Sequence, residues 1–190
     1  MFTILLVAAI LFGTVCAVGA GASHSEPAAV ADFNLDRYLG RWYEIARFDH
    51  RFERGLDYVT AEYILNDNGT LKVINRGYDR RRGRLRESIG KAKTSSVPGR
   101  LRVSFFLFFY SDYNIMALGD NYDWVLIGSS SPKYLWIMSR TPSLPPERLG
   151  EIIATARELG YDTDKLLFPA QQPSAKARVG EREKEKEYAM

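Results

Sequence analysis

Hydrophobic and polar positions alternate with a period of two along most of the chain between residues 42 and 140. The alternating segments are short and rich in β-branched and aromatic residues, which is typical of β-strands with one buried face. Turn-forming residues separate them, most clearly Asn66-Asp67-Asn68-Gly69. The pattern predicts eight strands, at residues 42–47, 59–64, 71–76, 85–92, 101–107, 113–118, 123–128 and 134–140.

The links between these segments are short, so neighbouring strands are expected to run antiparallel. Eight antiparallel strands that close on themselves form an up-and-down β-barrel whose interior can hold one small ligand. We therefore predict an all-β, eight-stranded barrel, with an open sandwich of two sheets as the alternative.

One segment after the strands has a helical period instead. The segment begins with two prolines, Pro145 and Pro146, which are suited to the start of a helix, and Gly160 is suited to its end. Apolar residues at three-to-four spacing lie between them, so we expect an α-helix that packs on the outside of the barrel. These residues are Leu149, Ile152, Ile153, Ala156 and Leu159.

The first 22 residues contain no charged side chain, and the second half of this segment turns to small residues. The run ends in Ala20-Gly21-Ala22, which is typical of a cleaved secretory signal peptide. Two alternatives remain: an uncleaved membrane anchor and a bacterial lipoprotein signal in which Cys16 is acylated. All three interpretations export the domain.

The remaining boundaries follow from composition. Residues 23–32 are expected to form a small, polar spacer, residues 33–172 the folded domain, and residues 173–190 a charged, solvated and helical or disordered tail. Of the 190 residues, 26 are Lys or Arg and 23 are Asp or Glu, a net charge of +3. That balance argues against nucleic-acid binding. The basic run at residues 80–86 carries little weight for it, because the aromatic residues alternate with the strands instead.

The chemistry available to the chain is narrow. It has one cysteine and two histidines, too few for a disulfide framework or a cysteine-based zinc site, and we expect neither cofactor nor metal. No phosphate-binding loop, nucleophile elbow, zinc-protease motif or dinucleotide glycine pattern occurs, and residues 128–131 are interpreted as a hairpin turn. His50 could act as a base but is more commonly a loop residue. A binding protein is therefore favoured over an enzyme.

Several segments together resemble the lipocalin family. Residues 34–47 match its Asn-x-Asp-x-x-x-Gly-x-Trp block, and the match extends through residues 48–56, 68–70, 73–78 and 134–142. The chain resembles the bacterial lipocalins, relatives of apolipoprotein D, from about residue 33 to residue 172. It departs from the family pattern at residues 104–112, where Gly-Pro and Gly-Gly steps are usual, so the shape of the loop at 107–112 is left open.

The resemblance implies the binding, storage or transport of hydrophobic small molecules in membrane maintenance. Fatty acids and lysophospholipids are the implied ligands, and the implied location is the bacterial outer membrane or periplasm. The resemblance also allows for a homodimer. Some lipocalins are catalytic, and the alternative function is a cofactor-free lipid isomerase or hydrolase. The prostaglandin-isomerising lipocalins use a cysteine thiol, however, and no cysteine would remain here if Cys16 is removed with the signal.

Strand direction and the family pattern nominate the site residues. The first and last strands meet at one end of a closed barrel, where Arg140 is expected to stack on Trp42. If Trp42 points inward, so do Glu44 and Ala46. On the other strands, we take the mainly apolar set of alternate positions, together with the family pattern, as the residues that face the interior. The alternative is that these residues only fill the core of a closed barrel. The predicted lining is Ala61, Tyr63, Leu71, Val73, Asn75, Val103, Phe105, Tyr134, Trp136 and Met138.

The opposite end should be open, because the loops after strands one, three, five and seven all lie there. The loop after the third strand contains Arg80, Arg81 and Arg82, which are expected to contact an anionic head group. The alternative is that they form a solvated loop. The apolar residues 107–110 would add aromatic side chains to this rim, which suits contact with a membrane surface.

Overall fold

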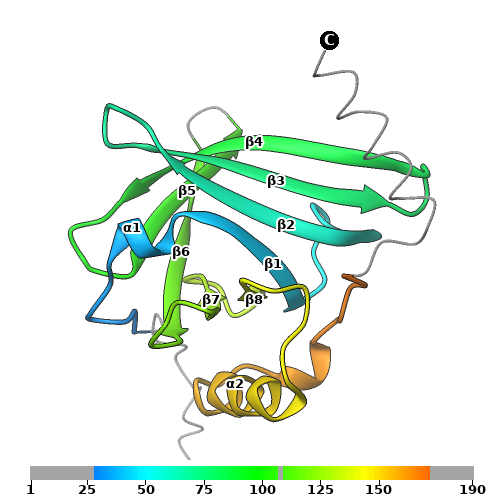
Figure 1. The fold of residues 1–190 in the computed structure, drawn as a ribbon. Helices are drawn as coiled ribbons and strands as arrows, with labels where there is room; N and C mark the ends of the chain where they lie inside the picture. Colours follow the sequence, from blue (N-terminus) through cyan, green and yellow to red (C-terminus); the bar gives the residue numbers. More distant parts are fainter. Residues whose placement is uncertain (1–27, 107–108, 172–190) are drawn as a thin grey trace, which may run out of the picture.

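The computed structural model describes residues 28–106 and 109–171, and their strands close into one antiparallel barrel (Figure 1). Each strand pairs with the next in the chain, and the last pairs with the first, which excludes the open sandwich. The predicted up-and-down order is confirmed. The strands are β1 (Gly40–Arg47), β2 (Leu56–Leu65), β3 (Leu71–Asp79), β4 (Arg84–Thr94), β5 (Arg100–Phe106), β6 (Phe109–Leu118), β7 (Trp124–Gly128) and β8 (Leu135–Ser139).

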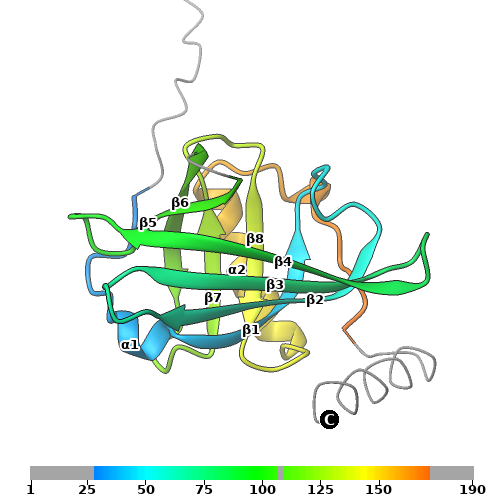
Figure 2. The same cartoon turned by 90° about the horizontal axis from the view of Figure 1, so that it is seen from above.

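The predicted helix is α2 (Pro146–Glu158), which lies outside the barrel beside β7 and β8 (Figures 1 and 2). Proline begins it, and Gly160 follows its end with φ of +87°, a left-handed conformation that glycine adopts without strain. The chain also forms two short elements that the periodicity did not predict, α1 (Leu35–Tyr38) and the 3-10 helix η1 (Thr163–Lys165). In the described part of the chain, no helix is long and apolar enough to span a membrane.

Two apolar layers hold this arrangement together. One lies inside the barrel, around Trp42, Leu71 and Ile115. The other lies between the barrel wall and α2, around Ile137 and Ile152. Strand β7 contributes to both layers, because alternate residues on it face the interior and the helix, and the strand is therefore apolar along its whole length.

The prediction that Ala46 faces the barrel interior is wrong. The pairing of β1 with β8 shifts register between Glu44 and Ala46, which marks a β-bulge. Beyond this bulge Ala46 belongs to the layer under α2, and the buried side chain of Arg47 turns toward Glu44 instead. Thus a charged residue takes the place that strict alternation gave to an alanine.

Two predicted boundaries also change. The backbone N–H of Val30 donates to Ile115 O (2.8 Å) and its side chain packs on the barrel core, so the folded unit includes part of the predicted spacer. Strand β6 begins at Phe109, so residues 109–112 are strand and not loop. Tyr110 is consequently not part of the rim; its ring lies on the outer face, 5.3 Å from Lys93 Nζ. Residues 1–22 with Cys16, residues 107–108 and the tail at 173–190 lie outside the described residues.

The end of the described chain closes a gap in the barrel wall. Strand β1 pairs with β2 only along its first half, from Gly40 to Tyr43. Residues 167–171 fill the space beyond, pairing with Arg47 on one side and bonding to β2 on the other. The Gln171 side-chain amide donates to both edges, to Glu44 O at 2.6 Å and to Val59 O at 2.9 Å. This segment is seen in orange-red beside the end of β1 in Figure 1.

Candidate functional site in the barrel interior

The two ends of the barrel differ in construction. At one end lie the start of β1 and the end of β8, with α1 packed across it. At the other end lie the β1–β2 connection at residues 48–55, the β3–β4 turn at residues 80–83 and the β7–β8 connection at residues 129–134. We call the first the closed end and the second the open end.

The closed end is sealed by Arg140 and Trp42. The guanidinium carbon lies 3.8 Å from the centre of the Trp42 ring. The guanidinium also donates to four backbone carbonyls, those of Arg37, Arg41, Tyr38 and Tyr122, at 2.7–3.2 Å. The planar, forked guanidinium can make these bonds and the ring contact together, which joins α1, β1 and the β6–β7 turn.

Exposure of the inward-facing side chains rises from the closed end toward the open end. On β5, Leu101 is 2% exposed, Val103 is half-buried and Phe105 is 43% exposed. Strand β4 shows the same trend from buried Ala92 to exposed Ser88. On β6, the inward positions Ile115, Tyr113 and Ser111 are buried, half-buried and exposed in turn. The inward-facing side chains are therefore solvent-accessible toward the open end and buried in an apolar floor toward the closed end.

The residues predicted to line the pocket divide by depth. Five are buried and form the floor and lower wall; they are Ala61, Tyr63, Leu71, Val73 and Met138. Five are partly or largely exposed and lie higher; they are Asn75, Val103, Phe105, Tyr134 and Trp136. Gly90 makes room for Phe105, since a Cβ at this glycine would lie 2.6 Å from Phe105 Cδ1. The lining role itself stays a prediction.

A buried charged cluster near the open end was not predicted. Arg47 Nε lies 3.0 Å from Glu44 Oε1 and 3.8 Å from Glu53 Oε2. Glu53 Oε2 also lies 2.9 Å from His50 Nε2 and accepts a hydrogen bond from Trp136 Nε1 at 3.1 Å. The cluster thus ties the β1–β2 connection to β1 and β8. The sequence signal was only the charged residues within an otherwise apolar strand.

The two carboxyl groups of this cluster titrate in opposite directions. Burial, together with repulsion from Glu53, raises the pKa of Glu44 well above its ordinary value despite the nearby Arg47. The pKa of Glu53 is lowered, because the close contact with His50, the hydrogen bond from Trp136 and the charge of Arg47 outweigh its burial. We infer that Arg47 is neutralised mainly by Glu53, so Arg47 is already paired within the protein.

Three tyrosines bring hydroxyl groups together deep in the barrel. Tyr113 Oη lies 2.6 Å from Tyr38 Oη and 2.7 Å from Tyr63 Oη. Burial raises the pKa of all three phenols, that of Tyr63 to about 12, so the hydroxyls stay protonated. Only Tyr63 was predicted here, because Tyr38 comes from α1 and the inward face of β6 was not assigned.

The three arginines predicted as anion contacts lie on the β3–β4 turn at the open end. Arg80 Nε is 3.4 Å from Asp57 Oδ2, and Arg82 Nη1 is 3.0 Å from Asp79 Oδ2. Arg81 donates its backbone N–H to Asp79. All three side chains are exposed, and two of the three already have a carboxylate partner. Their contact with an anion stays a prediction.

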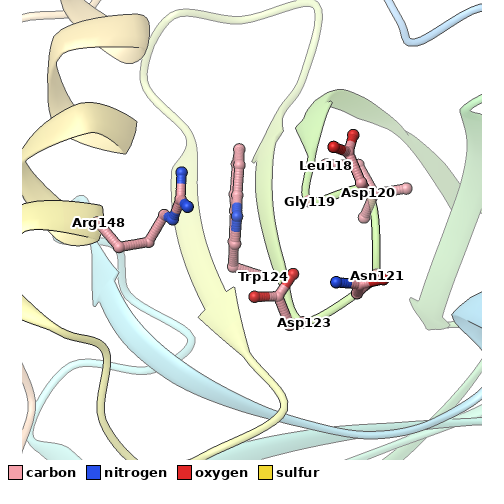
Figure 3. Close-up of a pocket in the computed structure, with 7 residues that line it drawn as sticks. All are labelled: Leu118, Gly119, Asp120, Asn121, Asp123, Trp124 and Arg148. Carbon is pink, nitrogen blue, oxygen red and sulfur yellow. The ribbon is translucent and has the colours of Figure 1, made fainter.

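Two surface pockets accompany the interior. A pocket of about 250 Å³ lies at the β6–β7 turn, lined by residues 118–121, Asp123 and Trp124 and by Arg148 of α2, which extends toward Trp124 in Figure 3. It belongs to the outside of the closed end. A second pocket, of about 360 Å³, lies near the open end between the β1–β2 connection and residues 167–169; we call it the rim groove. Its lining is Arg47, Asp49, Arg54, Gly55, Leu56, Asp57, Arg80, Leu167, Phe168 and Pro169.

Among residues 28–106 and 109–171, no group of three or more His, Cys, Asp or Glu side chains is placed to hold a metal ion. The inward-facing side chains of the barrel are therefore mostly apolar, with a few polar groups among them, namely the phenol hydroxyls and the Arg47 cluster. We call this inward-facing lining above the buried core the cup. The rim groove lies outside it.

Comparison with known proteins decides the family. The model of the lipocalin-like domain matches residues 33–171. The chain belongs to the lipocalin family. Outer membrane lipoprotein Blc of Escherichia coli (strain K12) is 49% identical over 148 residues, 77% of this chain and 83% of that protein. Apolipoprotein D of Rattus norvegicus is 35% identical over 163 residues, 78% of this chain and 85% of that protein.

Solved structures agree with this fold. Insecticyanin from the tobacco hornworm Manduca sexta superposes with a TM-score of 0.65 at 20% identity, covering 80% of this chain and 87% of that one. Lipocalins are binding proteins for hydrophobic ligands. Barrels of eight strands either fill their interior with side chains or hold one small ligand there.

Proposed function

We propose that this lipocalin binds fatty acids or lysophospholipids and stores or transports them in membrane maintenance, without chemically changing them. The observation that carries the proposal is the exposure gradient inside the barrel, from buried Leu101 to Phe105 at 43%. An acyl chain that enters at the open end would cover this wall, and each buried CH₂ contributes about 0.8 kcal/mol.

The open end suits a polar head group. Two exposed arginines, Arg54 and Arg80, lie in the rim groove beside Asp49, Asp57 and the apolar residues 167–169, whereas its Arg47 is buried and paired. Because both signs of charge are present there, the groove matches a zwitterionic lysophospholipid head as well as a carboxylate. Exposed Phe52 and Phe168, 59% and 56% exposed, supply apolar contacts for a membrane surface.

The proposed location is the bacterial outer membrane or periplasm. The relatives named outer membrane lipoprotein Blc support it, and so does the apolar segment at residues 1–22. Acylation of Cys16 and formation of a homodimer are predictions that accompany this proposal. Mass spectrometry of the protein extracted from its own membranes would check both.

The test of binding is Val103→Trp, titrated with a fluorescent fatty acid. Val103 is half-buried and faces the cup, so a tryptophan there would occupy the path of the acyl chain. Val73 is a poorer choice, because at 2% exposure a tryptophan would overpack the floor. Arg102→Trp, at the adjacent outward position on β5, is the matched control.

We expect Val103→Trp to weaken fatty-acid binding at least about tenfold, which corresponds to two lost CH₂ contacts, and Arg102→Trp to bind as wild type. Equal affinities in all three proteins would contradict a ligand in the cup. Mass spectrometry of lipid recovered after incubation checks the second half of the proposal, since a carrier returns its ligand unchanged and an isomerase or hydrolase does not.

A further inference from the structure

The phenol cluster does not satisfy all of its own hydrogen-bonding groups. Each hydroxyl of Tyr38, Tyr63 and Tyr113 donates one hydrogen bond and accepts up to two. The two hydrogen bonds among the three hydroxyls use two of their three hydrogens, so one O–H has no acceptor within these two bonds and acceptor positions are unused as well. The cluster sits in apolar surroundings of the core, where an unused polar position has a cost.

Asn75 adds a further acceptor. It lies on β3 at an inward position, paired with Ala61 of β2 and Ser88 of β4. Its side-chain carbonyl oxygen is buried and has no hydrogen-bond donor. Because buried polar atoms are normally paired, an orphaned acceptor in a ligand-binding cup points to a donor that arrives with the ligand.

Both features can be reached from the cup. Tyr113 and Asn75 are each half-buried, in contrast to the wholly buried Leu71 and Ile115 below them. Along β3, Asn75 comes two residues above Val73, which pairs with Tyr63, so amide and phenols flank the same stretch of the interior. An acyl chain between them would have polar groups on both sides.

We propose that the interior binds an acyl chain that carries a hydroxyl group, with that hydroxyl donating to Asn75 Oδ1 and accepting a hydrogen from the phenol cluster centred on Tyr113. This inference rests on the proposed function and names the ligand class more closely. A hydroxyl suits the site because it supplies the missing donor and can accept a phenol hydrogen in return. A carboxylate would bring no donor and would be buried without a paired cation.

The experiment compares stearate with a stearate hydroxylated in mid-chain, by calorimetric titration of the full chain. Wild type is expected to bind the hydroxylated acid about fivefold more tightly, the factor expected from one net hydrogen bond. Asn75→Leu and Tyr113→Phe each remove a polar group and keep the shape, so each should reduce that preference. Tyr110→Phe, on the outer face of the same strand, is the control and should leave it unchanged.

The outcomes separate the two proposals. Equal affinity of wild type for both acids, or tighter binding of plain stearate, overturns this inference and leaves the carrier function standing. A preference that survives in both Asn75→Leu and Tyr113→Phe overturns the assignment to these residues. Failure of wild type to bind either acid overturns the proposed function itself. Two variants are used so that the test still stands if the loss of the central phenol prevents folding.

Discussion

Removing the Arg140 side chain should destabilise the barrel without touching the ligand path. The guanidinium stacks on Trp42 and donates to carbonyls on α1, β1 and the β6–β7 turn. Arg140→Ala removes all of these contacts at once. The open end lies at the far side of the barrel, so fatty-acid affinity should not change.

The size of the effect follows from which contacts are sheltered. The carbonyls of Arg37 and Arg41 are in exposed surroundings, where water can replace the guanidinium, and we count nothing for them. The part-buried bonds to Tyr38 O and Tyr122 O contribute about 1 kcal/mol each. The contact with Trp42 contributes about 0.5–2 kcal/mol. The free energy of unfolding should therefore fall by about 3 kcal/mol.

Urea unfolding followed by far-ultraviolet circular dichroism measures this free energy independently of any change in Trp42 fluorescence. Arg41→Ala is the control, because this neighbouring side chain is exposed and its loss should change stability by less than about 0.5 kcal/mol. Arg140→Lys keeps the charge and loses the fork, so it should recover only part of the loss. If Arg140→Ala unfolds at the same urea concentration as wild type, the closed end is not held by this side chain.

Three further predictions concern other parts of the molecule. Because burial raises the pKa of Glu44 in the folded state, wild type should lose stability as pH rises above the ordinary value of 4.5; Glu44→Gln should flatten that fall, and an unchanged pH profile would refute the raised pKa. Gly90→Ala should cost about 1–3 kcal/mol, because its methyl would overlap β5; thermal unfolding checks this, and Gly150→Ala, inside α2 with open space around it, is the control and should not lower stability. Replacing residues 80–82 with serine should weaken sedimentation with anionic vesicles at low salt, and equal sedimentation would remove these arginines from the membrane-facing rim.

The sequence by itself determined the architecture of this protein. Period-two alternation, broken by turn signals, predicts eight strands in the right places, and short links between them require an up-and-down order. The outer helix could be predicted for the same reason, since its apolar stripe and its flanking Pro146 and Gly160 are local signals. The position of Trp42 and Arg140 at one end also follows, because strand direction alone brings the first and last strands together there.

Only the tertiary structure decided what the interior contains. The bulge at Glu44 and Ala46 reverses the facing of Arg47, and a bulge depends on pairing with β8 rather than on the local pattern. Likewise the phenol cluster needs Tyr38 from α1, Tyr63 from β2 and Tyr113 from β6 to meet across the barrel. The alternating pattern predicts which face of the sheet a side chain lies on. Strand register, bulges and the closure of the barrel determine which other side chains it contacts. The apolar wall is thus a property of the pattern, and the polar groups that would select a ligand are a property of the folded barrel.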